Sequence, residues 1–287
     1  MDEHRLRIDL APHHHKLLDM TIPQVLDFAA QTWPERTAVK IIEERVAEYS
    51  WARLRTTVDH MRSGLHRAGV APGDKVGLLL ANGMAFPLSW LAIIDAGAVA
   101  VPMNRKYTAA EVEFVLTDAD ARWFITTDEA TARLSVGGQI GPVPLTRVIA
   151  EETESVGHHF ADLLAAPVTD RIHVAHPHDV ANIQFTSGTT GLPKGCLLTH
   201  EYWIDFGVYS SALFDQPQRL LADHPFYYMQ NQAYFWIALA GGGAVYVTSG
   251  LSRRKYMGWL VDHGIDFAGV DDHMLDTPES QRTSTCT

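Results

Sequence analysis

The run TSGTTGLPKG, residues 186–195, decides how this sequence is interpreted. It combines small hydroxyl residues and glycines with one lysine, Lys194. Glycines let a backbone approach an anion with its N–H groups pointing inward, while hydroxyl groups donate hydrogen bonds and a lysine adds positive charge. The run therefore predicts a loop that surrounds phosphate groups.

Apolar segments flank this loop on both sides. Residues 182–185 precede it and residues 196–200 follow it, and both segments are rich in apolar or β-branched residues. We expect both to be short strands, so the loop joins two strands. The P-loop of a phosphotransferase would instead end in Gly-Lys-Ser or Gly-Lys-Thr and lead into a helix. Lys194 lies between Pro193 and Gly195, so the P-loop spacing is not met.

The ten residues closely resemble the phosphate-binding signature of the adenylate-forming (AMP-binding) enzymes, which include acyl-CoA synthetases, adenylation domains of peptide synthetases and luciferases. The match in order outweighs the alternative for an isolated Ser/Thr/Gly stretch, a flexible surface turn. Other segments are similar to successive landmarks of this superfamily: residues 21–39, 49–54, 69–82, 96–104 and 224–247. The resemblance covers residues 21–270.

This resemblance implies an ATP-dependent acid–thiol ligase of the acyl-CoA synthetase type. A carboxylate attacks the α-phosphorus of ATP, pyrophosphate leaves, and coenzyme A then takes the acyl group from the acyl-adenylate. ATP, magnesium and coenzyme A are thus implied, with a small carboxylic acid as substrate. Such transfers need mainly positioning and charge neutralisation, so no nucleophilic side chain is required. The residues carried over are Lys194 as the catalytic residue and, for nucleotide binding, Thr186, Ser187, Gly188, Thr189, Thr190, Gly191 and Lys194.

The aromatic stretch at residues 225–232 is similar in character to a superfamily segment in which an aromatic residue or histidine borders the acyl pocket. Tyr228 occupies that aromatic position, so the resemblance implies that it binds substrate. Asn231 stands where glycine is more usual, which leaves the shape of the pocket open. Plain core packing is the alternative role for such an aromatic cluster.

Composition favours a soluble, folded enzyme. With 46% hydrophobic residues among 287, the chain can bury at least one sizeable core in one or two domains. Its 34 acidic residues outnumber its 23 basic ones, which argues against nucleic acid as a partner. The apolar stretches are too short for a membrane span. Two cysteines and the lack of a signal-peptide pattern predict a cytoplasmic location, whereas nothing indicates the oligomeric state.

Alternating helical and strand patterns predict an α/β fold, with mostly parallel sheets covered by helices. Ser50 is expected to cap a helix that Gly69 ends, and Thr108 begins another helix with a capping-box spacing. Residues 75–80 and 122–126 are expected to form strands. The irregular segment at residues 135–178 is interpreted as a peripheral excursion before the sheet resumes at Asn182.

The resemblance also divides the chain. Residues 1–20 are interpreted as an N-terminal tail, 21–270 as part of an AMP-binding large domain, and 271–287 as a polar tail that we expect to be disordered. Superfamily members would continue with segments for adenine, ribose and magnesium, and with a small C-terminal domain that we expect to be absent here. We therefore interpret the chain as a truncated, inactive ligase. A non-catalytic nucleotide-binding or regulatory remnant is the alternative.

Clusters of histidine suggest weaker hypotheses. His173, His176 and His178 lie close together in the sequence, but they have no Cys or carboxylate partner at a standard zinc spacing. We therefore expect no metal site there. The three histidines at 13–15 are interpreted as part of a solvated tail.

Cys196 follows the loop directly, and its strand context predicts a buried structural thiol and not a nucleophile. Farther along the chain, the basic residues at 253–255 follow Ser252, which is a suitable helix-capping residue. They are expected to form a solvated helix face.

Overall fold

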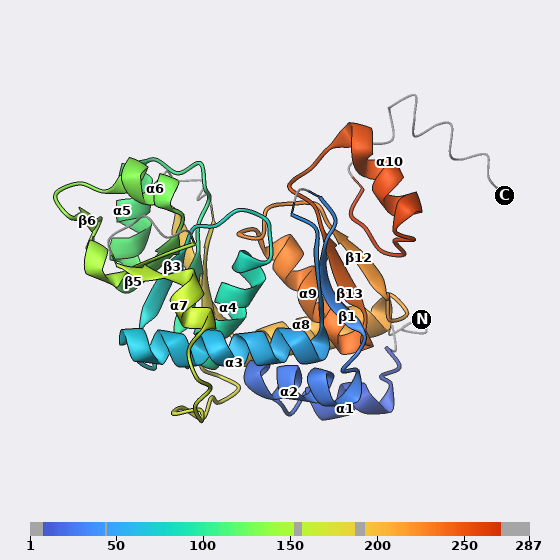
Figure 1. The fold of residues 1–287 in the computed structure, drawn as a ribbon. Helices are drawn as coiled ribbons and strands as arrows, with labels where there is room; N and C mark the ends of the chain where they lie inside the picture. Colours follow the sequence, from blue (N-terminus) through green and yellow to red (C-terminus); the bar gives the residue numbers. More distant parts are fainter. Residues whose placement is uncertain (1–7, 44, 152–156, 187–192, 271–287) are drawn as a thin grey trace, which may run out of the picture.

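The computed structural model describes residues 8–43, 45–151, 157–186 and 193–270. These residues form two main β-sheets, with helices between them and on their outer faces (Figure 1). The fold is therefore α/β with mostly parallel sheets covered by helices, as the sequence predicted. Residues 271–287 and most of the expected phosphate loop lie outside the described residues.

The larger sheet has seven strands in the described part of the chain, in the order β11-β10-β4-β3-β5-β8-β9. Neighbouring strands run parallel except β11, which is antiparallel to β10. The strands are β3 (Lys75–Leu78), β4 (Val99–Pro102), β5 (Ala121–Thr126), β8 (Val148–Ala150), β9 (His158–His159), β10 (Val180–Thr186) and β11 (Lys194–Thr199). A separate small hairpin consists of β6 (Gln139–Ile140) and β7 (Val143–Pro144).

The smaller sheet has four strands in the described residues, in the order β12-β13-β1-β2. Here β12, β13 and β1 run parallel, and only β2 is antiparallel to its neighbour. The strands are β1 (Thr37–Ile41), β2 (Ala47–Ser50), β12 (Arg219–Ala222) and β13 (Ala244–Val247). The sheet thus combines segments from both ends of the described chain.

Two helices begin or end at capping residues that the sequence predicts, whereas Ser252 precedes the helix at Arg253–Asp262 without a side-chain cap hydrogen bond. Ser50 accepts a hydrogen bond from the Arg53 amide, and Gly69 ends the same helix with a φ of 108°. Thr108 and Glu111 form the expected capping box. The helices are α1 (Pro12–Leu17), α2 (Ile22–Thr32), α3 (Trp51–Ala68), α4 (Ala85–Asp95), α5 (Ala109–Asp118), α6 (Asp128–Leu134), α7 (Phe160–Leu164), α8 (His200–Leu213), α9 (Met229–Gly241) and α10 (Arg253–Asp262), with a 3-10 turn at Leu145–Arg147. No described helix combines the length and apolarity needed to cross a bilayer.

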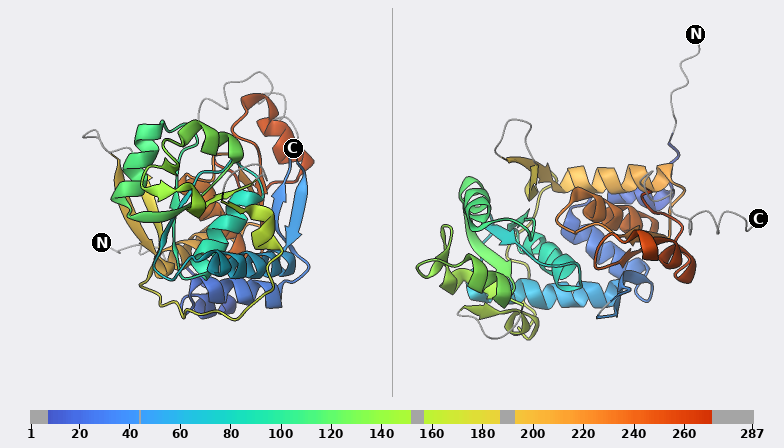
Figure 2. Two further views of the ribbon diagram at one scale, coloured as in Figure 1. Left: turned by 60° about the vertical axis from the view of Figure 1, so that its left-hand side comes forward. Right: turned by 90° about the horizontal axis from the view of Figure 1, so that it is seen from above.

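A layer of helices lies between the two sheets. Side chains of α2, α3, α4, α8 and α9 share one buried cluster, in which the Trp90 ring lies 5.3 Å from that of Trp236. α3 runs beneath both sheets, and α8 lies along the opposite edge in the view from above (Figures 1 and 2). The other face of the larger sheet has its own buried cluster, to which α5 and α6 contribute. Because helices cover both faces of the larger sheet, neighbouring strands can connect to helices on opposite faces.

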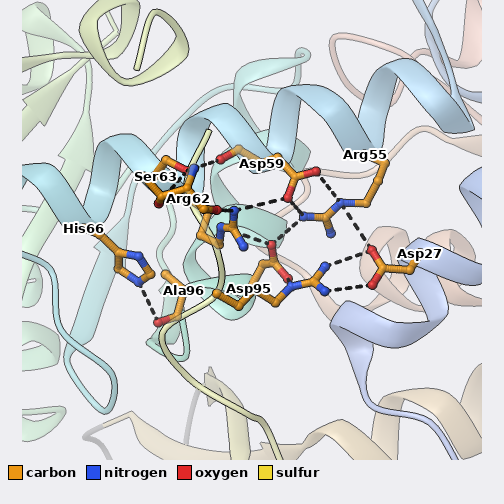
Figure 3. A network of polar contacts seen from close by, with 10 residues as sticks. Asp27, Arg55, Asp59, Arg62, Ser63, His66, Asp95 and Ala96 are labelled. Carbon is orange, nitrogen blue, oxygen red and sulfur yellow. Dashed lines mark hydrogen bonds and ion pairs between the residues drawn. The ribbon is translucent and has the colours of Figure 1, made fainter. Parts of the chain in front are cut away.

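A buried network of charged side chains fixes α2, α3 and α4 to one another (Figure 3). The Asp95 carboxylate is fully buried at the end of α4, and it accepts hydrogen bonds from Arg55 at 2.5 Å and from Arg171 at 2.9 Å. Arg171 also forms two 2.8 Å hydrogen bonds with Asp27, which raise the pKa of its guanidinium. Arg62 lies 3.8 Å from Asp95. The network therefore ties the extended segment around Arg171 to three helices.

Two expectations about irregular segments are wrong. Residues 135–178 are not merely peripheral, because β8 pairs with β5 and β9 pairs with β8 in the larger sheet. These strands have only three and two residues, too few to give a periodic pattern. Residues 13–15 belong to α1, where the His14 side chain is fully buried and a ring nitrogen of His13 lies 3.0 Å from the Ala240 carbonyl oxygen.

Candidate nucleotide- and acid-binding site

The expected phosphate loop connects the two antiparallel strands of a hairpin. Thr186 at the end of β10 pairs with Lys194 at the start of β11, and both residues are exposed. The two flanking strands are therefore confirmed. Ser187, Gly188, Thr189, Thr190 and Gly191 lie outside the described residues, so their nucleotide-binding role stays a prediction.

The hairpin lies at the end of the larger sheet where ligands commonly bind. Strands β3, β4 and β10 are parallel neighbours, so their carboxyl ends meet at one edge. β3 leads into α4 in the central layer, whereas β4 leads into α5 on the opposite face. Adjacent strands whose connections leave toward opposite faces create a crevice between their carboxyl ends. The hairpin and this crevice therefore share an edge of the sheet.

One cavity in this region is rich in aromatic residues and has a volume of about 380 Å³. The residues lining this aromatic cavity are Pro102, Asn104, Tyr107, Gln184, Phe185, Thr186, Tyr227, Tyr228 and Met229. It therefore brings Thr186 of the hairpin together with Tyr228, the residue expected to border the acid. Tyr228 is 48% exposed, so it is not a core residue, although its substrate-binding role stays a prediction.

Two tyrosines of the aromatic cavity, Tyr107 and Tyr227, have raised pKa values and keep their protons at neutral pH. Burial, followed by the effects of Glu111 and Tyr228, raises the pKa of Tyr107. Burial and a hydrogen bond to Tyr228 raise the pKa of Tyr227, and the rings of Tyr227 and Tyr228 lie 4.5 Å apart. The cavity thus offers neutral hydroxyl groups, which can donate hydrogen bonds to a carboxylate without repelling it.

A second cavity adjoins the first and has a basic lining. It has a volume of about 350 Å³, and its lining residues are Leu79, Leu80, Asn82, Asn104, Arg105, Lys106, Thr127, Glu129, Ala130, Arg133, Pro225, Tyr227 and Ser249. This basic cavity shares Asn104 and Tyr227 with the aromatic cavity. Arg133 donates hydrogen bonds to the carbonyl groups of Tyr107 and Arg105, at 2.9 and 3.2 Å. These contacts hold its guanidinium at the cavity.

The sequence interpretation missed this basic cavity. Arg105 and Lys106 follow β4 directly, whereas Arg133 comes from α6, so the fold is needed to bring the three cations together. The only available signal was an Arg-Lys pair after a buried strand, at the position where loops of parallel sheets carry functional residues. A short basic pair in a loop is more commonly a solvated surface feature.

Cys196 corrects another expectation. Its side chain is exposed, as is that of Leu197, because β11 is the edge strand of the larger sheet within the described residues. His173 lies 3.7 Å from Asp179, but the described ranges contain no group of three or more His, Cys, Asp or Glu side chains that could hold a metal ion.

Sequence comparison relates the chain to acyl-CoA ligases. Human medium-chain acyl-CoA ligase ACSF2, a mitochondrial protein, is 33% identical over 206 residues, which cover 63% of this chain and 33% of the ligase. The oxalate–CoA ligase of Arabidopsis thaliana is 33% identical over 183 residues, covering 62% of this chain and 35% of that protein. The chain therefore spans about a third of the length of these curated relatives.

Solved structures share its fold. The N-terminal domain of FACL13 from Mycobacterium tuberculosis matches 91% of this chain, and 66% of that chain, with a TM-score of 0.75 and 20% identity. O-succinylbenzoate coenzyme A synthetase of Bacillus subtilis, in complex with AMP, matches 92% of this chain and 64% of that chain, with a TM-score of 0.71 and 20% identity. Residues 26–270 also match the sequence model described as AMP-binding enzyme. The chain therefore belongs to the AMP-binding enzyme family.

Proposed function

We propose that this chain provides the nucleotide-, acid- and acceptor-binding surfaces of an ATP-dependent acid–thiol ligase. The single observation that carries this proposal is the shared position of Thr186 and Tyr228 on one cavity at the phosphate-binding hairpin. The acid would lie against neutral tyrosine hydroxyls while the hairpin holds the phosphates of ATP. Its substrate is a small carboxylic acid, activated as an acyl-adenylate.

In the first step, an oxygen of the carboxylate bonds to the α-phosphorus of ATP, and the bond to the β-phosphate breaks. The electron pair leaves with pyrophosphate. The positive charge of Lys194, at the end of the hairpin, would offset the negative charge on the phosphates. Preorganised charges and donors of this kind contribute much of the stabilisation of a phosphorus-centred transition state. No described side chain has to act as a nucleophile.

In the second step, the sulfur of coenzyme A bonds to the acyl carbon and the thiol loses its proton to solvent, while the bond from that carbon to the phosphate oxygen breaks and AMP leaves with the electron pair. The basic cavity suits the phosphate groups of such an acceptor, because Arg105, Lys106 and Arg133 outnumber its one acidic residue, Glu129. The two cavities share Asn104 and Tyr227. The flexible thiol-bearing arm of a coenzyme A molecule bound in the basic cavity would therefore reach the acyl group in the aromatic cavity. This adjacency favours an acid–thiol ligase over a site for ATP alone.

Calorimetric titration of the purified chain with ATP and with coenzyme A tests the assignment of ligands. Lys194→Ala should weaken the binding of ATP, and Arg133→Ala should weaken the binding of coenzyme A. We expect each Kd to rise by about tenfold, because charge-assisted hydrogen bonds contribute about 1.5–3 kcal/mol. Arg254→Ala is the matched control, since Arg254 is an exposed cation on α10. Equal weakening of both ligands by Arg254→Ala would contradict the assignment.

Mass spectrometry then distinguishes a ligase from a nucleotide-binding protein without turnover. The chain is supplied with ATP, magnesium ions, coenzyme A and a panel of short, medium-length and aromatic acids. Formation of acyl-adenylate and thioester that disappears with Lys194→Ala supports an active ligase and contradicts the interpretation of the chain as inactive. Binding of both ATP and coenzyme A without either product supports the truncated, inactive ligase, whereas binding of ATP alone supports the non-catalytic alternative. Absence of nucleotide binding contradicts all three.

A further inference from the structure

The aromatic loop, residues 224–228, forms a wall of both cavities. It connects β12 to α9 and contains neither helix nor strand. Within the loop, a single turn is closed by a 3.0 Å hydrogen bond from the Tyr228 amide to the Pro225 carbonyl, and side chains from other elements supply further contacts. Tyr227 lines both cavities, and Tyr228 lines the aromatic one. Any residue that holds this loop therefore sets the position of the tyrosine hydroxyls.

Side-chain amides hold the start of the aromatic loop. Asn82 accepts a hydrogen bond from the Phe226 amide at 2.9 Å and donates one to the His224 carbonyl at 2.7 Å. Asn231, which is fully buried, donates a second hydrogen bond to the same carbonyl. Asn231, at the position where glycine is more usual in the superfamily, thus holds the aromatic loop through this hydrogen bond.

Two buried glutamines hold the end of the loop. The Gln232 amide donates to the Phe226 carbonyl at 2.8 Å, and the Gln184 amide donates to the Tyr227 carbonyl at 2.7 Å. Gln232 is fully buried, and Gln184 is 4% exposed. Gln184 belongs to β10 and stands two residues before Thr186, so one side chain connects the strand of the phosphate-binding hairpin to the aromatic loop.

The orientation of the Gln184 amide is determined by its neighbours. Its oxygen accepts hydrogen bonds from Asn182 at 3.3 Å and from Gln232 at 3.4 Å. The Asn182 oxygen in turn accepts a hydrogen bond from the Trp90 indole at 3.1 Å. Reversing the Gln184 amide would place its oxygen against the Tyr227 carbonyl oxygen, and both contacts to its present oxygen would be lost. Only one orientation satisfies the whole chain of bonds.

We propose that Gln184 is a positioning residue that couples the phosphate-binding hairpin to the acid-binding wall. Through its hydrogen bond to Tyr227, a nucleotide that orders the end of β10 also orders Tyr227 and Tyr228. Because coupling between two sites is reciprocal, an acid that orders the tyrosines strengthens nucleotide binding in turn. This inference rests on the proposed function, and it adds a residue that acts through the backbone of its neighbour.

Hydrogen–deuterium exchange of the ligand-free chain tests the positioning role directly. Gln184→Met keeps a similar volume but cannot donate to the Tyr227 carbonyl. We expect the loop amides at residues 226–229 to exchange about tenfold faster, in line with the loss of one buried hydrogen bond, while β3 and β5 stay protected. Thr126→Val is the matched control, since the Thr126 hydroxyl is a buried donor to the Leu79 carbonyl in the same sheet. Equal effects of both variants on loop exchange would overturn the inference.

Gln184→Glu adds a pH-dependent readout that a purely structural role would not produce. The protonated carboxyl group can donate to the Tyr227 carbonyl as the amide does, whereas the ionised group has no proton to donate. Burial should raise the pKa of the introduced carboxyl group. Loop protection relative to the parent chain should therefore be restored below that pKa and lost above it. Protection that does not change with pH would contradict donation by residue 184.

The coupling is measured with AMP and benzoate as probes. In the parent chain, saturating AMP should lower the Kd of benzoate about fivefold or more, the lower range of measured couplings between sites. Gln184→Met should reduce that factor to about one while each probe still binds alone. Coupling that survives this substitution would overturn the inference. Failure of AMP to bind the parent chain would instead count against the proposed function, because the exchange measurement needs no ligand.

Discussion

Two buried polar networks in this molecule differ in charge and in place. The ionic network brings Asp95 together with arginines and joins α2, α3 and α4 at the base of the molecule (Figure 3). The neutral network runs from Trp90 through Asn182 and Gln184 to the aromatic loop, at the edge where both cavities lie. One fastens helices to one another, and the other fastens the wall of the candidate site.

The difference follows from the physical cost of burying each kind of group. A buried charge needs several well-placed partners, and loss of one partner leaves an uncompensated charge. An amide costs less to bury and carries no net charge. Neutral side chains can therefore hold the site in place without adding charge to it. The positive charges available to bound phosphates are then those of Lys194 and of the cations lining the basic cavity, Arg105, Lys106 and Arg133.

Removal of the central carboxylate should have the largest effect on folding. Asp95→Ala removes the 2.5 Å partner of the buried Arg55 guanidinium and the 2.9 Å contact to Arg171. Arg55 keeps its contacts with Asp59 and, at 3.6 Å, with Asp27. We expect the free energy of unfolding to fall by about 3–5 kcal/mol, the usual range for breaking a buried ion pair. Urea denaturation followed by tryptophan fluorescence measures this change. A loss below about 1 kcal/mol would show that the network is not the stronger of the two.

A buried histidine extends the comparison to pH. The Nδ1 atom of His200 accepts a hydrogen bond from the Ile22 amide at 3.2 Å, and burial lowers the pKa of His200 from 6.5 to about 4. Because the unfolded chain binds this proton more readily, the contribution of neutral His200 is present above pH 6.5 and is lost as the pH falls toward 4.

Through loss of this contribution, the free energy of unfolding should have fallen by about 3 kcal/mol at pH 4, relative to its value above pH 6.5. Urea denaturation across this pH range, compared with His200→Asn, measures it. The variant keeps a hydrogen-bond acceptor but does not titrate. Parallel stability curves for both chains would contradict a depressed pKa at His200.

The neutral network should respond less than the ionic one. Asn182→Leu removes the acceptor of the Trp90 indole and one donor to Gln184. Leaving a buried donor unsatisfied costs about 1–3 kcal/mol, so the free energy of unfolding should fall by that amount. The same urea titration tests this expectation. If Asn182→Leu lowers the free energy of unfolding more than Asp95→Ala does, the neutral network contributes more to stability than the ionic one, contrary to this expectation.

Local sequence signals predicted the elements that position the site. Ser50 with Gly69, and Thr108 with Glu111, mark helix ends because caps depend on neighbouring residues alone. The flanks of the glycine-rich run likewise predicted the hairpin strands. Cys196 was placed wrongly, because exposure of an edge strand depends on which strands lie beside it.

The candidate site itself could be predicted only in part. The resemblance identified Thr186, Lys194 and Tyr228 individually, and the structure places Thr186 and Tyr228 on one cavity. The sequence resemblance could not reveal that Gln184 donates to the Tyr227 carbonyl or that Arg133 lines the basic cavity. These contacts join segments that are far apart in the chain. Both contacts depend on the three-dimensional packing of the chain and leave no local pattern in the sequence.

Lys194→Ala should have the smallest effect on stability and separates binding from folding most clearly. Lys194 begins β11 as an exposed residue whose backbone pairs with Thr186, and alanine preserves that backbone pairing. We expect the free energy of unfolding to change by less than about 0.5 kcal/mol, as at most exposed positions. ATP binding should nevertheless weaken, since the charge next to the phosphates is lost. Paired urea and calorimetric titrations on one preparation make the comparison. A stability loss as large as that of Asn182→Leu would mean that Lys194 supports the fold, and its effect on ATP could then no longer be assigned to its charge.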